Sequence, residues 1–479
     1  MCSVFKAQWR LACVLLLLST TAQPAVASEE ARPNIVLIMA DDLDSGGLSY
    51  FPNITRHLVD QGTSFERFFV TNSWCCPSRS SVLRSQYVHS HGVWTNTPPE
   101  GGFARFYQQG LERSTVGTWM RDAGYRTALM GKYLNHYPGG VVPETYVPPG
   151  WDEWAVPVKN LYREYGYRLN ENGRVTRYGW GEQDYLSDVL AGRARDFITR
   201  STSPFFLYLA PVAPHLPANP AVRHAGAFPG AKAPRTPSFN RPDVSREPHW
   251  LRSRPQLDDK QIDRVDRLYR NRMRATLGVD DLVGSVVDTL AETGKLDNTY
   301  IFFTSDNGFH LGTHRLRRGK TTPFEEAIKV PLVVRGPGVP KAAETGQMGA
   351  TVDLAPTMAE LGGAVTPSFA EGRSLTPLLR GEWPANWRRN VLVEFARPLN
   401  RASAAQTPVP PYRAVRTQRY TYVKYQTGEE QLYDLLTDPY QLDNLAATAS
   451  PALLADLRGR LEAMRTCAGA SCRVADSRE

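Results

Sequence analysis

The amino-acid sequence predicts an α/β domain with a large, mostly parallel central sheet flanked by helices. Two observations support this prediction: short apolar runs end abruptly in polar residues, and segments with helical periodicity lie between these runs. A third observation concerns the C-terminal part, where the pattern changes beyond about Trp383 to several short strands and a final helix. We therefore expect a large α/β domain at residues 28–382 and a smaller α+β C-terminal subdomain at residues 383–479.

The strands expected in the large sheet share one composition. Each is a continuous apolar run, which is typical of a strand buried on both faces of a parallel sheet. Each run ends in polar or turn-forming residues, and ligands bind to open parallel sheets at the carboxyl ends of the strands. A functional site is therefore expected where the runs end. The four runs are residues 33–40, 126–130, 205–209 and 300–304.

Segments with helical periodicity alternate with these strands. They lie at residues 115–124, 184–199 and about 258–290. Between the first two of them, Asn172-Gly173 predicts a tight hairpin turn. Residues 217–255 are rich in proline and lack periodicity, so we expect a long surface excursion near the site.

The C-terminal subdomain is predicted from a second group of short strands. These are expected at residues 390–395, 412–415 and 420–425, and a helix is expected at residues 453–464. No internal repeat and no low-complexity segment interrupts this order.

The first 27 residues have the pattern of a signal peptide. Lys6 and Arg10 precede an apolar run at residues 11–18, and small residues at 25–27 offer a cleavage site. The run is too short to cross a bilayer of about 30 Å. We therefore expect a secreted protein, extracellular, periplasmic or lysosomal according to its host, with neither a membrane nor nucleic acid as a partner.

The chain carries a modest excess of positive charge. Its formal net charge is +8, and removal of Lys6 and Arg10 with the leader lowers it to +6. Such an excess favours anionic ligands, but a solvated basic surface is the more common explanation. The charge alone therefore assigns no function.

Six cysteines are present, of which Cys2 and Cys13 belong to the leader. Cys467 and Cys472 lie close together in the sequence, and in an oxidising compartment they are expected to form a small disulfide loop. The remaining pair, Cys75-Cys76, is adjacent, and neighbouring cysteines rarely bridge each other because the geometry is strained. That pair needs another explanation.

Four polar residues at two strand ends are candidates for metal ligands. Asp41 and Asp42 follow the first apolar run, and Asp306 and Asn307 follow the last. Oxygen ligands of this kind suit Ca²⁺ or Mg²⁺, and no cysteine or histidine cluster has the spacing of a zinc site. The alternative is structural, since an aspartate pair can cap a helix and Asp-Asn-Gly can form a turn.

The segment around Cys75 carries the most specific motif. Cys75-Cys76-Pro77-Ser78-Arg79 matches the Cys-x-Pro-Ser-Arg signature of type I sulfatases. Further matches follow in family order across roughly residues 33–446. Together they resemble the branch that contains N-acetylglucosamine-6-sulfatases and bacterial arylsulfatases. The matching segments are PNIVLIMADD, AGYRTALMGKYLN, APVAPH, TSDNG, GKTTPFEE, KVPLVVRGPG and QLYDLLTDPYQLDNL.

This resemblance implies an alkaline-phosphatase-like fold with an antiparallel sheet in the C-terminal subdomain. It also implies that Cys75 is oxidised to formylglycine by a formylglycine-generating enzyme during export. A thiol has no advantage in attacking an anionic sulfate ester, whereas the hydrate of an aldehyde next to a divalent cation offers a strong nucleophile. Its second hydroxyl lets the sulfated intermediate release sulfate and regain the aldehyde.

The resemblance further implies a role for each of nine residues. One divalent cation, expected to be Ca²⁺, would be bound by Asp41, Asp42, Cys75, Asp306 and Asn307. Arg79 would stabilise the hydrated aldehyde, Lys132 and Lys320 would contact sulfate oxygens, and His215 would protonate the leaving oxygen. Positive charge is needed where negative charge builds on the sulfate, and imidazole has a suitable pKa for proton transfer.

The sequence departs from the family pattern at two places. Many sulfatases have a histidine two residues after the lysine that matches Lys132, whereas this chain continues as Tyr133-Leu134-Asn135-His136. The base that breaks down the intermediate is therefore unassigned, with His136, His89 and His91 as candidates. The second departure is Leu83-Arg84-Ser85, where the family commonly has Leu-Thr-Gly. His310 and His314 could line the pocket or serve a structural role.

Three functions fit these residues. The first is a sulfatase acting on a sulfated sugar, such as a glycosaminoglycan, or on an aryl sulfate. The second is a phosphodiesterase or phosphonate monoester hydrolase of the same superfamily, because phosphate and sulfate esters are similar in shape and charge. The third is a sulfated-glycan binder without turnover.

Overall fold

The computed structural model describes residues 1–3, 32–397 and 409–479. The expected signal peptide therefore lies almost entirely outside the described residues. The two predicted sheets are both present: a ten-stranded sheet and a four-stranded sheet. The large sheet has the strand order β10-β2-β9-β8-β1-β7-β3-β4-β5-β6.

The centre of the large sheet is parallel, as the sequence predicts. Strand β1 pairs in parallel with both β7 and β8, and β3 continues this block. Antiparallel strands enter at β9 and β5. The strands are β1 (Asn34–Ala40), β2 (Thr63–Phe69), β3 (Arg126–Gly131), β4 (Glu153–Lys159), β5 (Arg168–Glu171), β6 (Arg174–Arg177), β7 (Phe205–Ala210), β8 (Thr299–Ser305), β9 (Leu332–Arg335) and β10 (Ala343–Ala350).

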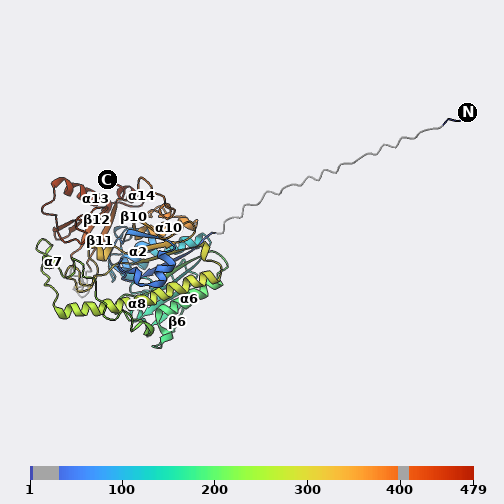
Figure 1. Cartoon of the computed structure of the whole chain (residues 1–479), viewed down its shortest axis with the longest axis horizontal. Coiled ribbons are helices and arrows are strands. Elements are labelled where there is room, and N and C mark those ends of the chain that lie inside the picture. The colour runs from blue at the N-terminus through green and yellow to red at the C-terminus, as the bar shows by residue number, and fades with distance from the viewer. Residues whose placement is uncertain (4–31, 398–408) are drawn as a thin grey trace. The chain divides into compact units, whose positions relative to one another are not determined.

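Helices cover both faces of this sheet, which explains why β1 is apolar after its first residue, Asn34. Alternate side chains of a strand point to opposite faces. Leu37 of β1 belongs to the core formed with α2, α5 and α10, whereas Val36 and Ile38 belong to the core formed with α6 and α8. Figure 1 shows α6 and α8 side by side. The helices are α2 (Cys75–Arg84), α5 (Val116–Asp122), α6 (Leu186–Arg200), α8 (Asp259–Glu292) and α10 (Leu354–Leu361).

Helix α8 begins at a capping box. The Asp258 side chain accepts a hydrogen bond from the Gln261 backbone N–H, and the Gln261 side chain accepts one from the Asp258 backbone N–H. Each helix predicted for the large domain is present with ends that differ by a few residues. None of the helices within the described residues has the length and apolar character needed to cross a bilayer.

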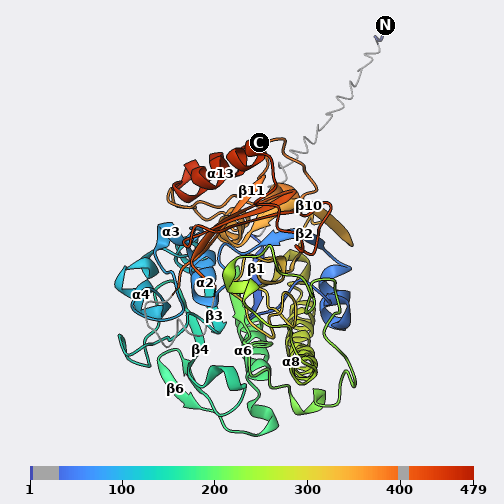
Figure 2. The ribbon, with the colours of Figure 1, turned by 90° about the vertical axis from the view of Figure 1, so that its left-hand side faces the viewer.

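The C-terminal part forms the antiparallel sheet that the resemblance implies. Helix α13 (Pro451–Arg465) packs against this sheet (Figure 2). The Glu394 backbone N–H donates to the Thr71 carbonyl, which joins this sheet to the segment before α2. Strand β14 and helix α14 (Ala470–Ala475) were not predicted. The strands are β11 (Asn390–Phe395), β12 (Tyr412–Thr417), β13 (Tyr420–Tyr425) and β14 (Glu430–Asp434).

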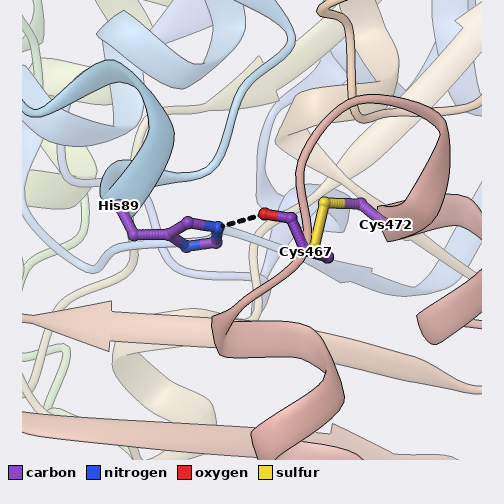
Figure 3. A group of neighbouring side chains, drawn as sticks. All are labelled: His89, Cys467 and Cys472. Atoms are coloured by element: carbon purple, nitrogen blue, oxygen red, sulfur yellow. Dashed lines mark hydrogen bonds between the residues drawn. A yellow bond between two sulfur atoms is a disulfide. The ribbon is translucent and has the colours of Figure 1, made fainter.

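Three local predictions are confirmed. Cys467 and Cys472 form a disulfide (Figure 3). Asn172-Gly173 turns the chain between β5 and β6. The excursion at residues 217–255 contains only two short helical turns, Val222–His224 and α7 (His249–Arg252).

Candidate active site

The four predicted oxygen ligands meet because β1 and β8 are neighbours in the sheet. Ala40 is paired with Ser305, so the residues that follow both strands leave the sheet at the same edge. The Asp42 backbone N–H donates to Asp306 Oδ1 at 3.1 Å, and Asn307 Nδ2 donates to Asp42 Oδ1 at 2.7 Å. All four side chains, including Asp41, are buried.

Cys75 is the first residue of α2 and faces this cluster. Its Sγ lies 3.6 Å from Asp41 Oδ1, 4.0 Å from Asp42 Oδ1 and 2.7 Å from Lys320 Nζ. Burial raises the pKa of the Cys75 thiol to about 12, although Lys132 and Lys320 oppose the effect. An unmodified Cys75 is therefore a neutral thiol and a poor nucleophile at neutral pH.

Two lysines bring positive charge to the same place. Lys132 Nζ donates to Asp41 Oδ2 at 2.6 Å and lies 3.8 Å from Asp306 Oδ2. Lys320 Nζ contacts Asp42 Oδ1. Burial alone would lower the pKa of each lysine, but Asp41 for Lys132 and Asp42 for Lys320 outweigh it and raise both pKa values. Both lysines are therefore charged.

Arg79 lies one helical turn after Cys75 and binds residues that follow strands β8 and β3. Its Nε donates to Asp306 Oδ2 at 2.7 Å, and its Nη1 donates to the Lys132 carbonyl at 2.8 Å. Its Nη2 is buried and has no hydrogen-bond partner among the described residues. Arg79 thus leaves one donor free beside the cluster.

His215 reaches the cluster from the segment that follows β7. Its Nδ1 donates to the Leu216 carbonyl at 2.7 Å, because a carbonyl oxygen can only accept. Its Nε2 lies 3.7 Å from Asp42 Oδ2. Burial lowers the pKa of His215, and Asp41 and Asp42 only partly oppose this. His215 therefore presents Nε2 toward the carboxylates.

The donor atoms that converge here could hold a divalent cation. One ligand atom each from Asp41, Asp42, Cys75 and His215 lies within 4.8 Å of the others. Asn307 Oδ1 is buried without a hydrogen-bond partner among the described residues, as expected for an oxygen available to a ligand. Carboxylate and amide oxygens are the ligands that Ca²⁺ and Mg²⁺ prefer.

The other histidines considered from the sequence are engaged elsewhere or exposed. His89 pairs with Glu394 at 2.8 Å, and its Nε2 donates to the Cys467 carbonyl at 2.9 Å (Figure 3). His91 contacts Ser81, and His136 is exposed. His310 lies between the hydroxyls of Thr313 and Thr322, and His314 stacks on Phe324. Among the described contacts, none places these five side chains against Cys75.

Two residues at the site were not predicted from the sequence. Asn96 Oδ1 accepts the Cys76 backbone N–H at 2.8 Å and so caps the first turn of α2. Tyr162, in the short helix η4 (Leu161–Arg163), stacks on His215. No local motif marks either residue, because both contacts join segments that are distant in the sequence.

Comparison with known proteins identifies the family. Residues 33–364 match the family model described as Sulfatase. The chain belongs to the sulfatase family. Residues 312–467 of this sulfatase also match the model described as N-sulphoglucosamine sulphohydrolase, C-terminal. The protein is therefore an enzyme that hydrolyses sulfate esters.

Two relatives of the sulfatase cover most of the chain. It is 35% identical to N-acetylglucosamine-6-sulfatase of Homo sapiens, over 94% of this chain and 87% of the relative. It is 26% identical to N-acetylglucosamine-6-O-sulfatase of Bacteroides thetaiotaomicron, over 91% of this chain and 86% of the relative. These similarities confirm the resemblance that the sequence motifs indicate.

Solved structures confirm the alkaline-phosphatase-like fold. A protein solved with its substrate, D-glucosamine-2-N,6-O-disulfate, superimposes with a TM-score of 0.75 at 23% identity, covering 90% of this chain and 97% of that one. The phosphonate monoester hydrolase of Agrobacterium radiobacter superimposes with a TM-score of 0.73 at 23% identity, covering 91% of this chain and 96% of that one. The sulfatase and the phosphonate hydrolase therefore share one fold.

Proposed function

We propose that this sulfatase removes sulfate from a sulfated sugar, with formylglycine formed from Cys75 as its nucleophile and Ca²⁺ as its metal. The observation that carries the proposal is the position of Cys75, buried at the start of α2 between two carboxylates and Lys320. The sugar substrate is supported by the relatives named N-acetylglucosamine-6-sulfatase and by the neighbour solved with a glucosamine disulfate.

The carboxylates and the asparagine are proposed to hold the cation. Asp41, Asp42, Asp306 and Asn307 offer oxygen atoms, and Cys75 contributes after its modification. A bound divalent cation supplies positive charge that lowers the pKa of a neighbouring hydroxyl. The aldehyde of formylglycine supplies, when hydrated, one hydroxyl for attack on sulfur and a second through which sulfate is later released.

The cationic side chains are proposed to bind and stabilise the sulfate group. Lys132 and Lys320 are charged; Lys132 contacts Asp41, and Lys320 contacts both Asp42 and Cys75, so both can contact the oxygens on which negative charge builds. The free Nη2 of Arg79 can donate to the hydrated aldehyde. These contacts cost little reorganisation because all three side chains are already fixed by carboxylates.

His215 is proposed to protonate the leaving oxygen of the sugar. Its Nδ1–H is committed to the Leu216 carbonyl, so the imidazolium form carries its second proton on Nε2, from which that proton can be donated. An alcohol is a poor leaving group, and a positioned acid accelerates such a reaction by about 10²- to 10⁴-fold. The base for breakdown of the intermediate stays unassigned.

Desulfation of a panel of sulfated sugars tests the substrate, with Cys75→Ala as the blank. We expect inorganic sulfate from N-acetylglucosamine-6-sulfate and none from the blank. Mass spectrometry of the peptide that contains Cys75, from protein made in its native host, tests the nucleophile. An unmodified thiol with no turnover would support the sulfated-glycan binder instead.

The phosphoesterase alternative is tested by comparing matched esters. We expect a larger kcat/KM for 4-nitrophenyl sulfate than for 4-nitrophenyl phosphate or phenylphosphonate. The fold is shared with a phosphonate monoester hydrolase, so it does not by itself exclude this alternative. A much faster reaction with the phosphorus esters would contradict the sulfate-ester assignment of the site.

Export and modification are proposed to be linked. The signal-peptide pattern of residues 1–27 supports secretion, and the intact Cys75-to-Arg79 signature supports recognition by a formylglycine-generating enzyme on the way. Detection of a mature chain that begins near residue 28, outside the cytoplasm and carrying the aldehyde, would be the expected result.

A further inference from the structure

Tyr162 contacts three residues that line the site. Its ring stacks on the imidazole of His215, with a centroid distance of 4.0 Å and an interplanar angle of 20°. Lys132 Nζ lies 5.1 Å from the centroid of the same ring. The Tyr162 hydroxyl accepts a hydrogen bond from Asn135 Nδ2 at 3.0 Å. The ring therefore joins the segments that follow β3 and β7, although it comes from the segment after β4.

His215 depends on this stack more than the other site residues do. Its hydrogen bond to the Leu216 carbonyl fixes the position of Nδ1, but the imidazole ring can still rotate about that contact. The 3.7 Å separation between Nε2 and Asp42 Oδ2 is too long for a hydrogen bond. An aromatic face against the imidazole sets the ring plane and hence the direction of Nε2.

The position of Lys132 is fixed by contacts other than the Tyr162 ring. Its ammonium group donates to Asp41 at 2.6 Å, and its main chain is held by Arg79. Loss of the Tyr162 ring would remove a cation–π contact from Lys132 but would leave the ion pair in place. The main consequence of losing the ring therefore falls on His215.

We propose that Tyr162 is a positioning residue that holds His215 in the orientation needed to protonate the leaving group. The inference rests on the proposed function, because it takes His215 as the acid. It assigns the effect to the aromatic ring of Tyr162 and gives its hydroxyl a minor part. We expect the loss of kcat/KM in a Tyr162 variant to depend on the leaving group of the ester. A general loss of site structure would instead lower kcat/KM for all esters alike.

The experiment measures kcat/KM for aryl sulfates that range from 4-nitrophenyl sulfate to phenyl sulfate. Nitrophenolate leaves without a proton, whereas phenolate benefits from an acid. We expect Tyr162→Ala to lower kcat/KM for phenyl sulfate by about 10- to 100-fold and that for 4-nitrophenyl sulfate by less than about threefold, since a general acid acts only where a proton is needed. Tyr162→Phe, which keeps the ring, should restore most of the lost activity.

Two further variants complete the design. Tyr165→Ala removes a neighbouring aromatic ring that stacks on Trp180 and packs at a tilt against Tyr185, and its effect should not depend on the leaving group. His215→Ala should show the same dependence as Tyr162→Ala. The double variant of Tyr162 and His215 should lose little more than His215→Ala alone, because the two residues act through one group.

The outcomes separate this inference from the proposed function. Equal losses on all esters for Tyr162→Ala would overturn the inference, and so would a Tyr162→Phe variant as impaired as Tyr162→Ala. Either result leaves a working sulfatase. A wild-type protein that hydrolyses none of the sulfate esters would overturn the proposed function and this inference together.

Discussion

Asp41 and Asp306 lie in one cluster, yet their surroundings shift their pKa values in opposite directions. Burial alone raises both, but for Asp41 the charges of Lys132 and His215 outweigh it and hold the pKa far below its usual range. For Asp306, burial and the nearby Asp41 carboxylate raise the pKa despite Arg79. A divalent cation among these carboxylates would relieve their mutual repulsion, so metal and site stability are coupled.

Removal of the proposed neutral ligand Asn307 should weaken metal binding without changing the charge of the cluster. We expect Asn307→Ala to raise the Ca²⁺ concentration needed for half-maximal activity by at least about 10-fold, since even indirect partners of a metal change affinity by 10- to 100-fold. Titration calorimetry of EDTA-treated protein with Ca²⁺ provides a readout independent of turnover. Equal Ca²⁺ affinities for the variant and the wild type would contradict the role of Asn307.

Glu112 offers a pH-dependent contribution to stability away from the metal ligands. It is buried, and it accepts hydrogen bonds from Tyr133 at 3.3 Å and Tyr146 at 3.0 Å. Burial raises its pKa from 4.5 to about 7, and the two hydrogen bonds oppose this only in part. The folded protein therefore binds more protons than the unfolded chain between these pH values. Stability from this group is present below pH 4.5 and is lost as the pH rises to about 7.

Glu112→Gln should remove this dependence, because an amide stays neutral. Relative to the wild type, the variant should gain up to about 3 kcal/mol of unfolding free energy between pH 4.5 and pH 7.5. Denaturant unfolding of both proteins at the two pH values measures the difference. A stability difference that is the same at both pH values would show that Glu112 does not titrate in this range.

Among the helices and strands, the sequence predicts those whose own residues show a clear apolar or periodic pattern. Strand β1 is recognisable because both of its faces are buried in apolar cores. Strand β2 has charged residues within it, β9 has only four residues, and β10 carries two glycines and few apolar side chains. These strands are stabilised by pairing with one another, which a single segment does not reveal.

The same distinction applies to the site. The proximity of the four predicted oxygen ligands could be foreseen because neighbouring parallel strands end at one edge, and Cys75 could be singled out because its motif is continuous in the sequence. The stack of Tyr162 on His215 could not be foreseen, because it depends on how two loops fold over the sheet. Contacts between loops carry no periodicity that a sequence analysis could use.

The cap of helix α8 should act locally. The helix has 34 residues, and its first turn is exposed while its later turns pack against the sheet. Asp258→Ala removes the bond to the Gln261 N–H, at a cost of about 1 kcal/mol to the first turn. Hydrogen exchange of the peptide at residues 257–264 should accelerate, with no change in the rest of α8. Asp259→Ala is the matched control, and equal acceleration in both variants would contradict a specific cap.

At the scale of the whole molecule, one buried arginine joins distant parts of the chain. Arg388 donates two hydrogen bonds to Asp353, at 2.6 and 2.7 Å, and one to Asp476 at 2.8 Å. Asp353 immediately precedes α10 on the large sheet, and Asp476 follows α14 near the C-terminus. All three side chains are fully buried. The last residues of the chain are thereby attached to the catalytic core.

Arg388→Met should destabilise the fold strongly, because it leaves Asp353 buried without its cation and Asp476 with only Arg373 as a partner. The expected loss is about 3–5 kcal/mol. Arg389→Met is the control, since the neighbouring arginine is exposed and pairs with Glu479 at the surface, where such pairs contribute about 0–1 kcal/mol. Denaturant unfolding of both variants measures the contrast. Similar stabilities for the two would contradict a structural role for the buried network.

The complete burial of Cys75 has a consequence for how active protein is made. If an enzyme recognises the Cys75-to-Arg79 signature and oxidises this thiol, it must do so before the chain folds, because the whole signature is buried within helix α2 of the folded protein. Chains that fold before they are modified would then stay inactive, whereas chains that are modified first would fold into active enzyme. Treatment with the modifying enzyme should activate denatured chains on refolding, whereas folded, unmodified protein should stay inactive.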